Sequence, residues 1–256
     1  MSNNDSTSKT LLVALILCIV CSVLVSSAAV MLKPLQQKNK SLDMKTNILR
    51  AAGLYQEDVS VEEQFKKVKA RIVDLETGTY SDAVDADSYD QRKAAKDPAM
   101  SNDLSEEQDI AKIGRQAKYV KVYIVEDAKG LDKIILPIKG YALWSTLYGF
   151  IALNNDLNTV AGLGFYEHAE TPGLGGEIDN PGWKALWVGK HVYAGDDVAI
   201  SVIKGSSDPA SPKHDYQIDG LSGATLTSRG VDNLIKFWMG ENGFAPFLEN
   251  LKRGDA

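Results

Sequence analysis

A run of hydroxyl-bearing and small residues near the carboxyl end is the part of this sequence best suited to bind an anion. The run Asp-Gly-Leu-Ser-Gly-Ala-Thr spans residues 219–225 and leads into an apolar stripe of helical spacing that closes at Gly240. Ser222, Thr225 and Thr227 place hydroxyls where free N–H groups and the positive end of a helix dipole favour negative charge.

Two interpretations of this run stay open. Gly223 and Ala224 clear space around Thr225, so that a phosphate could be cradled there or esterified to a hydroxyl. Ordinary N-capping by one Ser or Thr would need only one of these groups. The residues alone therefore favour no more than a candidate phosphate site.

A second unusual segment is Glu-Thr-Pro-Gly-Leu-Gly-Gly at residues 170–176, which follows an expected strand. Its glycines allow close approach of the backbone to a ligand, and Thr171 offers a hydroxyl. A wide turn without a ligand is the alternative interpretation.

Other common kinds of site are not supported. The sequence holds no phosphate loop, no dinucleotide-binding glycine motif and no H-E-x-x-H, and its three His accompany no G-x-S-x-G elbow. The aspartates between residues 82 and 97 fit no EF-hand and indicate a solvated acidic face. We therefore assign no catalytic residue and no metal ligand.

Composition bounds the class of protein. The chain has 256 residues, a net charge of −6, 44% hydrophobic and 24% charged residues, which excludes collagen-like, disordered and disulfide-scaffold proteins. The acidic balance argues against a nucleic-acid partner, because phosphate backbones are bound by clustered Lys and Arg.

Residues 10–32 form a stretch of 23 residues without any charge. A helix of that length is roughly 34 Å long, enough to cross a hydrocarbon core. A cleaved signal is the alternative, but its apolar region is normally shorter. We predict an uncleaved single-pass anchor preceded by a cytoplasmic N-terminus at residues 1–9, although Lys33, Lys38 and Lys40 leave the orientation open by charge.

The two cysteines, Cys18 and Cys21, both lie in the anchor, so the rest of the chain can form no disulfide. They stand three apart on one helix face, where packing is the simpler interpretation and a metal or redox pair the alternative.

The elements expected between the anchor and the carboxyl end are helices first and strands later. We expect membrane-proximal helices and a polar excursion over 33–117, followed by a compact domain over 118–256. The helices expected near the anchor are a short one near 42–52 ended by Gly53, and one capped by Ser60 with Glu63 that continues to Gly78. The excursion covers 79–117. Strands are expected at 119–125, 133–138, 146–153, 159–166 and 198–203, and further helices at 181–187 and up to Gly240.

Strand runs with helices gathered at the ends predict an α+β domain. The predicted fold class is therefore a single N-terminal transmembrane helix followed by an α+β soluble domain.

The run at 219–225 resembles the D-x-x-[ST]-[GS]-A-[ST] site at which a flavin transferase attaches FMN to the last Thr or Ser. The anchor, the length, the 170–176 loop and this run, in that order, resemble the NqrC family, which belongs to the Na⁺-translocating NADH:quinone reductases. The resemblance covers essentially the whole chain, and the run shows no departure from the motif.

The resemblance implies a covalent FMN on Thr225 as a phosphothreonyl ester, with Ser222, Gly223, Ala224 and Thr227 around the phosphate. It implies further that the loop of Thr171, Gly173, Leu174 and Gly175 forms a wall for the isoalloxazine, with Leu174 packed on the ring. The soluble FMN-binding domain would be periplasmic and anchored in a bacterial inner membrane.

The partners implied are the other members of a six-subunit membrane complex and a flavin transferase for maturation. That complex passes electrons from NADH to ubiquinone while exporting Na⁺, so this chain would be one flavin station in a translocase. The anchor holds no Asp, Glu, Lys, Arg or His, which favours an ion route through other subunits.

Two other hypotheses stay open. The equivalent flavin subunit of an Rnf ferredoxin:NAD oxidoreductase shares the anchor and the attachment motif. A cofactor-free membrane-anchored scaffold would keep the fold but would not need Thr225.

Overall fold

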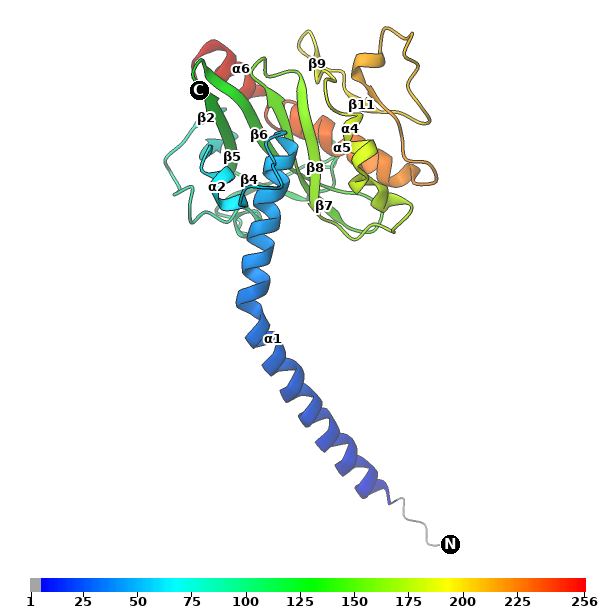
Figure 1. Cartoon of the computed structure of the whole chain (residues 1–256). Coiled ribbons are helices and arrows are strands. Elements are labelled where there is room, and N and C mark those ends of the chain that lie inside the picture. The colour runs from blue at the N-terminus through cyan, green and yellow to red at the C-terminus, as the bar shows by residue number, and fades with distance from the viewer. Residues whose placement is uncertain (1–5) are drawn as a thin grey trace. The chain divides into compact units, whose positions relative to one another are not determined.

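The structure, a computed structural model, describes residues 6–256 and divides the chain into two compact units, Met1–Met44 and Lys45–Ala256. The expected cytoplasmic N-terminus at 1–9 therefore lies mostly outside the described residues. Helix α1 (Thr7–Ala51) makes up the described part of the first unit and contributes its last residues to the second (Figure 1).

α1 contains the expected membrane-spanning stretch, and its length and apolar composition fit a membrane anchor. The separation of this stretch from a second short helix near 42–52 is wrong, because α1 continues unbroken through Pro34 to Ala51. Most residues that follow Pro34 are Leu, Gln, Lys and Met, which have high helix propensity. The expected end at Gly53 is confirmed by the left-handed φ of +67° at that glycine.

The second unit is built on a six-stranded antiparallel sheet. Its strands in spatial order are β2 (Thr79–Tyr80), β1 (Val68–Asp74), β5 (Tyr119–Asp127), β6 (Gly130–Tyr141), β7 (Thr146–Asn154) and β8 (Val160–Glu167). The four strands expected between 119 and 166 are confirmed, with ends that differ by only a few residues. The short turns at 127–130 and 154–156 connect neighbouring strands as hairpins, and strands joined in this way pair antiparallel.

The helix expected from Ser60 to Gly78 is wrong beyond its first turns. Ser60 does cap α2 (Val61–Phe65) by accepting a hydrogen bond from the Glu63 N–H, but the chain then forms strand β1. Val68 and Ile72 are four apart, and this spacing places them on one face of a helix and equally on one face of a strand. Pairing of β1 with β5 along its full length decides between the two.

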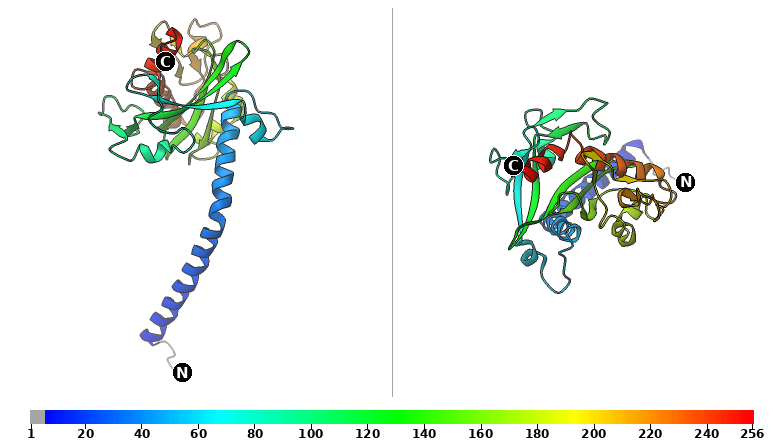
Figure 2. Two further views of the ribbon diagram at one scale, coloured as in Figure 1. Left: turned by 90° about the vertical axis from the view of Figure 1, so that its left-hand side faces the viewer. Right: turned by 90° about the horizontal axis from the view of Figure 1, so that it is seen from above.

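Each face of the sheet is covered. Helices α5 (Thr225–Met239) and α6 (Ala245–Arg253) pack on one face, and α6 was not expected from the sequence. On the other face Phe65 of α2 contacts Tyr123 edge-to-face at 6.0 Å, and the backbone of Ala51 lies against Gly162 of β8. The right-hand view of Figure 2 shows α5 in orange and α6 in red on one side of the green strands and α2 in cyan on the other. The sheet is thus buried on both sides and forms a rigid support for the loops at its ends.

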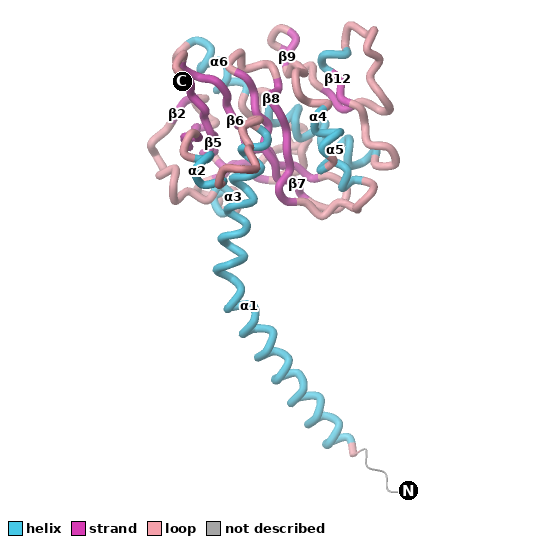
Figure 3. Tube along the Cα trace, in the orientation of Figure 1, coloured by secondary structure: helices cyan, strands magenta, loops and turns pink. Residues whose placement is uncertain are grey.

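Short elements and loops fill the remainder (Figure 3). The expected strand at 198–203 divides into two shorter strands, one paired antiparallel and one parallel to a later strand. The polar excursion at 79–117 contains ordered pieces rather than plain loop. The short elements are α3 (Gln91–Ala94), β3 (Ser101–Asp103), β4 (Arg115–Ala117), η1 (Gly175–Asp179), α4 (Pro181–Ala185), β9 (Tyr193–Ala194), β10 (Asp197–Val198), β11 (Ser201–Val202), η2 (His214–Tyr216) and β12 (Gln217–Ile218).

The expected boundary between 33–117 and 118–256 does not coincide with the division in the structure. Residues 45–117 belong to the same compact unit as the rest of the domain, because β1 pairs with β5 across that boundary. Arg92 of α3 also forms two 3.0 Å contacts with the carboxylate of Glu167 in β8. The excursion is therefore part of the domain and not an appendage to the anchor.

Candidate functional site

The 219–225 run turns sharply and leads into α5 as expected. Gly223 has a φ of +73°, Ala224 is buried, and Thr225 is the first residue of α5 with its side chain exposed. Within the described residues, no side chain caps α5 at Ala224. The first N–H groups of a helix lack intrahelical partners, so this end of α5 can bind an anion beside the Thr225 hydroxyl.

Ser222 is exposed next to Gly223, whereas the hydroxyls of Thr227 and Ser228 are not. Thr227 is fully buried and donates to Glu170 Oε2 at 2.7 Å, and Ser228 Oγ accepts from the Leu221 N–H at 2.9 Å. Residues two apart on a helix point in different directions, so Thr227 cannot share the solvent side with Thr225. The structure therefore separates Thr227 from the other residues expected around the phosphate.

The two segments singled out by the sequence meet in space. A Cβ added to Gly223 would lie 3.2 Å from Leu174 Cδ2, and Leu174 is 45% exposed. Thr171 and Gly173 are exposed on the same loop, and Gly173 has a φ of +74°. The expected wall and the expected attachment residue are thus brought to one place.

Gly175 is the exception within the expected wall, because it is buried under the loop. A Cβ there would lie 2.5 Å from Thr227 Oγ1 and 2.8 Å from Glu170 Oε2. Its lack of a side chain lets the loop lie directly on the Thr227–Glu170 hydrogen bond.

The structure adds two residues that carried no role in the sequence analysis. Glu170 is 5% exposed, and its Oε1 accepts from the backbone N–H groups of Trp144 at 2.9 Å and Ser145 at 3.2 Å. Trp144, in the turn between β6 and β7, is 65% exposed. The only sequence signal for Glu170 was its position as an acidic residue at the start of a loop of small residues. Trp144 stands alone in the sequence and gave no signal of a role in a site.

Asp219 holds the start of the run in place. Its carbonyl accepts from Trp183 Nε1 at 2.8 Å, and its carboxylate accepts from the Ser207 N–H at 2.8 Å. Asn180 caps α4 as expected, and α4 carries Trp183 toward the run. The first motif residue thus positions the backbone that leads into α5.

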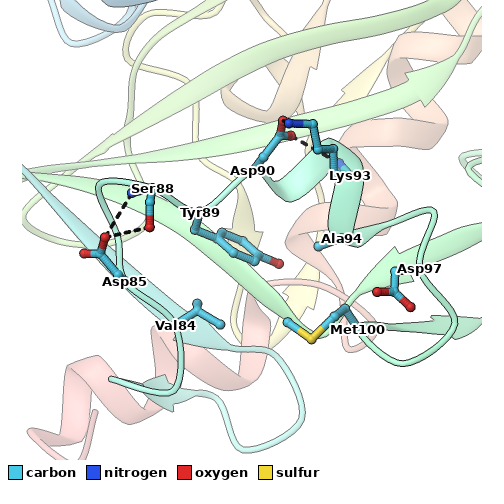
Figure 4. Close-up of a pocket in the computed structure, with 9 residues that line it drawn as sticks. All are labelled: Val84, Asp85, Ser88, Tyr89, Asp90, Lys93, Ala94, Asp97 and Met100. Carbon is cyan, nitrogen blue, oxygen red and sulfur yellow. Dashed lines mark hydrogen bonds and ion pairs between the residues drawn. The ribbon is translucent and has the colours of Figure 1, made fainter.

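A separate open cavity of about 500 Å³ lies in the polar excursion (Figure 4). Its polar groups are engaged with one another, because Asp85 accepts from Ser88 Oγ at 2.6 Å and Lys93 Nζ lies 3.3 Å from Asp90. None of the residues predicted for the site lines this cavity.

Known proteins resemble this chain over most of its length. A model of the FMN-binding domain family matches residues 142–240, which include both segments of the site. The chain is 57% identical over 261 residues to NqrC of the Na⁺-translocating NADH-quinone reductase from Pseudomonas aeruginosa, and the match covers 100% of both chains. It is 48% identical to the corresponding protein from Haemophilus ducreyi, over 98% of this chain and 96% of that one. The chain belongs to the NqrC family of Na⁺-translocating NADH-quinone reductases.

Solved members of the NqrC family share the fold. The crystal structure of NqrC from Shewanella oneidensis matches with a TM-score of 0.76 at 34% identity, covering 85% of this chain and 99% of that one. The family member from Parabacteroides distasonis matches with a TM-score of 0.64 at 26% identity, covering 86% and 96%. The predicted fold class, an N-terminal apolar helix with an α+β domain, is confirmed.

The residues present fit FMN at both of its ends. The uncapped start of α5 and the open space at Gly223 suit a phosphate, while exposed Leu174 suits the face of an apolar ring.

Proposed function

We propose that this chain is the electron-transfer subunit of a Na⁺-translocating NADH:ubiquinone oxidoreductase and carries FMN in a phosphoester bond to Thr225. The observation that carries the proposal is the placement of Thr225. Its side chain is exposed at an uncapped helix start, directly after a left-handed glycine and a buried alanine, and beside the loop of Leu174.

The attachment is supported by the contrast among the nearby hydroxyls. Thr227 and Ser228 are buried and hydrogen-bonded within the domain, whereas Ser222 and Thr225 face solvent. Of these, Thr225 occupies the last position of the attachment motif. In the ester, Thr225 Oγ1 would lose its proton and bond to phosphorus in place of one phosphate hydroxyl of FMN, so that one water is released overall. Helix N–H groups would stabilise the negative charge that remains.

The loop of Thr171–Gly175 would bind the isoalloxazine through Leu174, and exposed Trp144 offers a second apolar surface. FMN held there supplies one- and two-electron transfer, which the side chains of this domain do not provide. The chain's own part is to fix the position of the ring and to set the polarity around it. NADH oxidation and Na⁺ passage would belong to partner proteins, because the sequence has no dinucleotide motif and residues 10–32 contain no Asp, Glu, Lys, Arg or His.

The soluble domain would face the periplasm, with α1 anchoring it in a bacterial inner membrane among the members of a six-subunit assembly. A periplasmic site favours covalent attachment by a flavin transferase, because free FMN made in the cytoplasm would not readily replace a lost cofactor. Electron flow from NADH toward quinone, coupled to Na⁺ translocation, is the activity that the names of the relatives state. For this chain we propose ubiquinone as the acceptor and export as the direction of Na⁺ movement.

The proposal is tested by expressing the full chain with a flavin transferase and examining denatured protein for in-gel flavin fluorescence. Wild type should give a fluorescent band and Thr225→Val none, because the esterified hydroxyl is lost. Thr225→Ser is the matched control and should keep the band. A band that persists in Thr225→Val would show a different attachment residue, and no band in wild type would favour the cofactor-free scaffold.

A further inference from the structure

We propose that Glu170 is a positioning residue that fixes the Trp144 turn and the Thr171–Gly175 loop on helix α5, and so sets the pocket for the isoalloxazine. The inference rests on the proposed function, since it concerns the same FMN. It adds a role for a residue outside the attachment motif and outside the expected wall.

The contacts of Glu170 link three segments that are distant in sequence. Oε1 accepts from the backbone of Trp144 and Ser145 in the β6–β7 turn, at 2.9 and 3.2 Å. Oε2 accepts from Thr227 Oγ1 of α5 at 2.7 Å. Glu170 itself begins the third segment, the glycine loop. Every one of these partners is a donor, so the carboxylate is matched to its surroundings at both oxygens.

Close packing reinforces this connection. Gly175 lies so near the Thr227–Glu170 hydrogen bond that a Cβ would come within 2.8 Å of both side chains. Ser145 Oγ also accepts from the Ala169 N–H at 2.8 Å, which ties the turn to the start of the loop. These contacts place the loop directly on α5, with the Glu170 side chain between the two.

The segments that Glu170 joins are those that present apolar surface near Thr225. Trp144 is 65% exposed and Leu174 is 45% exposed, and the Trp144 turn is held through its backbone instead of through the indole. On α5, a Cβ at Gly230 would lie 2.6 Å from Ala142 Cα, so the β6–β7 turn rests against the same helix. Glu170 thus controls the spacing between two surfaces while it is itself buried.

A Gln at position 170 would lose the negative charge and one of the two acceptor oxygens. Its N–H₂ would face either the two backbone N–H groups, which cannot accept, or Thr227 Oγ1, whose buried hydroxyl would have to turn its hydrogen away from position 170. The turn and the loop would then separate from α5 while Thr225, at the exposed helix start, keeps its hydroxyl. We expect attachment of FMN to persist and the environment of its ring to change.

The experiment uses the full chain in detergent after coexpression with flavin transferase. Three properties are measured: flavin per chain, visible circular dichroism of the flavin, and quenching of flavin fluorescence by iodide. We expect Glu170→Gln to retain the flavin, to lose most of the dichroism and to raise the iodide quenching constant severalfold. Glu177→Gln is the matched control. Among the hydrogen bonds of the described residues, the Glu177 side chain accepts one from Asn180 Nδ2, so this variant should leave both signals unchanged.

Two further variants keep the test decisive if Glu170→Gln does not fold. Thr227→Val removes the donor to Oε2 with little change of shape and should reproduce the change, while Thr227→Ser keeps the hydroxyl and should restore the wild-type signals. Wild-type dichroism and quenching in both Glu170→Gln and Thr227→Val would overturn the inference. Wild type without bound flavin would instead contradict the proposed function.

A measurement on flavin-free protein tests the role of Glu170 independently of the proposed function. Trp144 is the exposed one of the four tryptophans, the others being at most 7% exposed, so iodide-accessible tryptophan emission in Thr225→Val protein reports on the turn. Adding Glu170→Gln to this protein should lower the fluorescence anisotropy of that emission. Unchanged anisotropy would contradict the role of Glu170 even without any flavin.

Discussion

At the scale of single residues, the structure assigns different tasks to hydroxyls that look equivalent in the sequence. Thr225 is exposed at the start of α5, whereas Thr227 is buried against Glu170. Helical geometry separates them, because a step of two residues turns a side chain to another side. The proposed attachment residue and the residue that secures the helix are therefore neighbours with opposite surroundings.

Lys139 provides a residue-scale prediction about pH. It lies in β6 and donates a hydrogen bond from Nζ to the Arg115 carbonyl at 3.3 Å. Burial is the main cause that lowers the pKa of Lys139, to about 8. The charge of Arg92 lowers this pKa as well, and the charge of Asp109 partly offsets the shift. The unfolded lysine keeps its proton to about pH 10.5, so between these values the unfolded chain binds more protons and rising pH favours the folded state.

We therefore expect the free energy of unfolding to rise by about 1–2 kcal/mol between pH 8 and 9.5, measured by chemical denaturation. Lys139→Met should remove most of that rise, since it leaves no proton to release. An equal rise in the variant would mean that other groups cause it. The range stops below pH 10, because burial raises the pKa of Tyr123 and of Tyr193, and such groups reverse the trend at higher pH.

At the scale of elements, the sequence predicted the strands β5–β8 and helix α5 well. Turn residues separate the strands, and α5 has an apolar stripe of helical spacing that ends at Gly240. The sequence-based prediction was wrong at β1, where the same apolar spacing is compatible with a helix and with a strand. Val68 and Ile72 share a face in either a helix or a strand, and only the partner strand β5 distinguishes them. Glu170 could not be predicted as a link for a related reason, since its partners Trp144 and Thr227 are far away in the sequence.

Two glycines of β8 test the docking of the last turn of α1 within the domain. A Cβ at Gly162 would lie 2.4 Å from the Ala51 carbonyl oxygen, whereas one at Gly164 would lie 3.6 Å from Asn47 Oδ1, an ordinary contact. Gly162→Ala should therefore lower the free energy of unfolding by about 1–3 kcal/mol. Gly164→Ala, on the same strand face, should change it by less than about 0.5 kcal/mol. Equal effects in the two variants would show that α1 does not pack there.

At the scale of the whole molecule, the proposed orientation determines which compartment holds the flavin. The chain has two cysteines, both in α1, so replacing them by Ser leaves a background for single labelling sites. Ser88→Cys, at an exposed position of the domain, should react with a membrane-impermeant maleimide in cells whose outer membrane alone is permeabilised. Ser8→Cys, before the apolar stretch, should react only after lysis. The reverse pattern would place the domain in the cytoplasm.

The central claim is that Thr225 carries the cofactor, and peptide mapping by mass spectrometry tests it most directly. The full chain purified after coexpression with flavin transferase is digested, and the peptide containing 219–228 is fragmented. We expect one added FMN, less one water, on Thr225 and on no other residue of that peptide. An unmodified Thr225 in flavin-containing protein, or the same mass on Ser222 or Thr227, would contradict it.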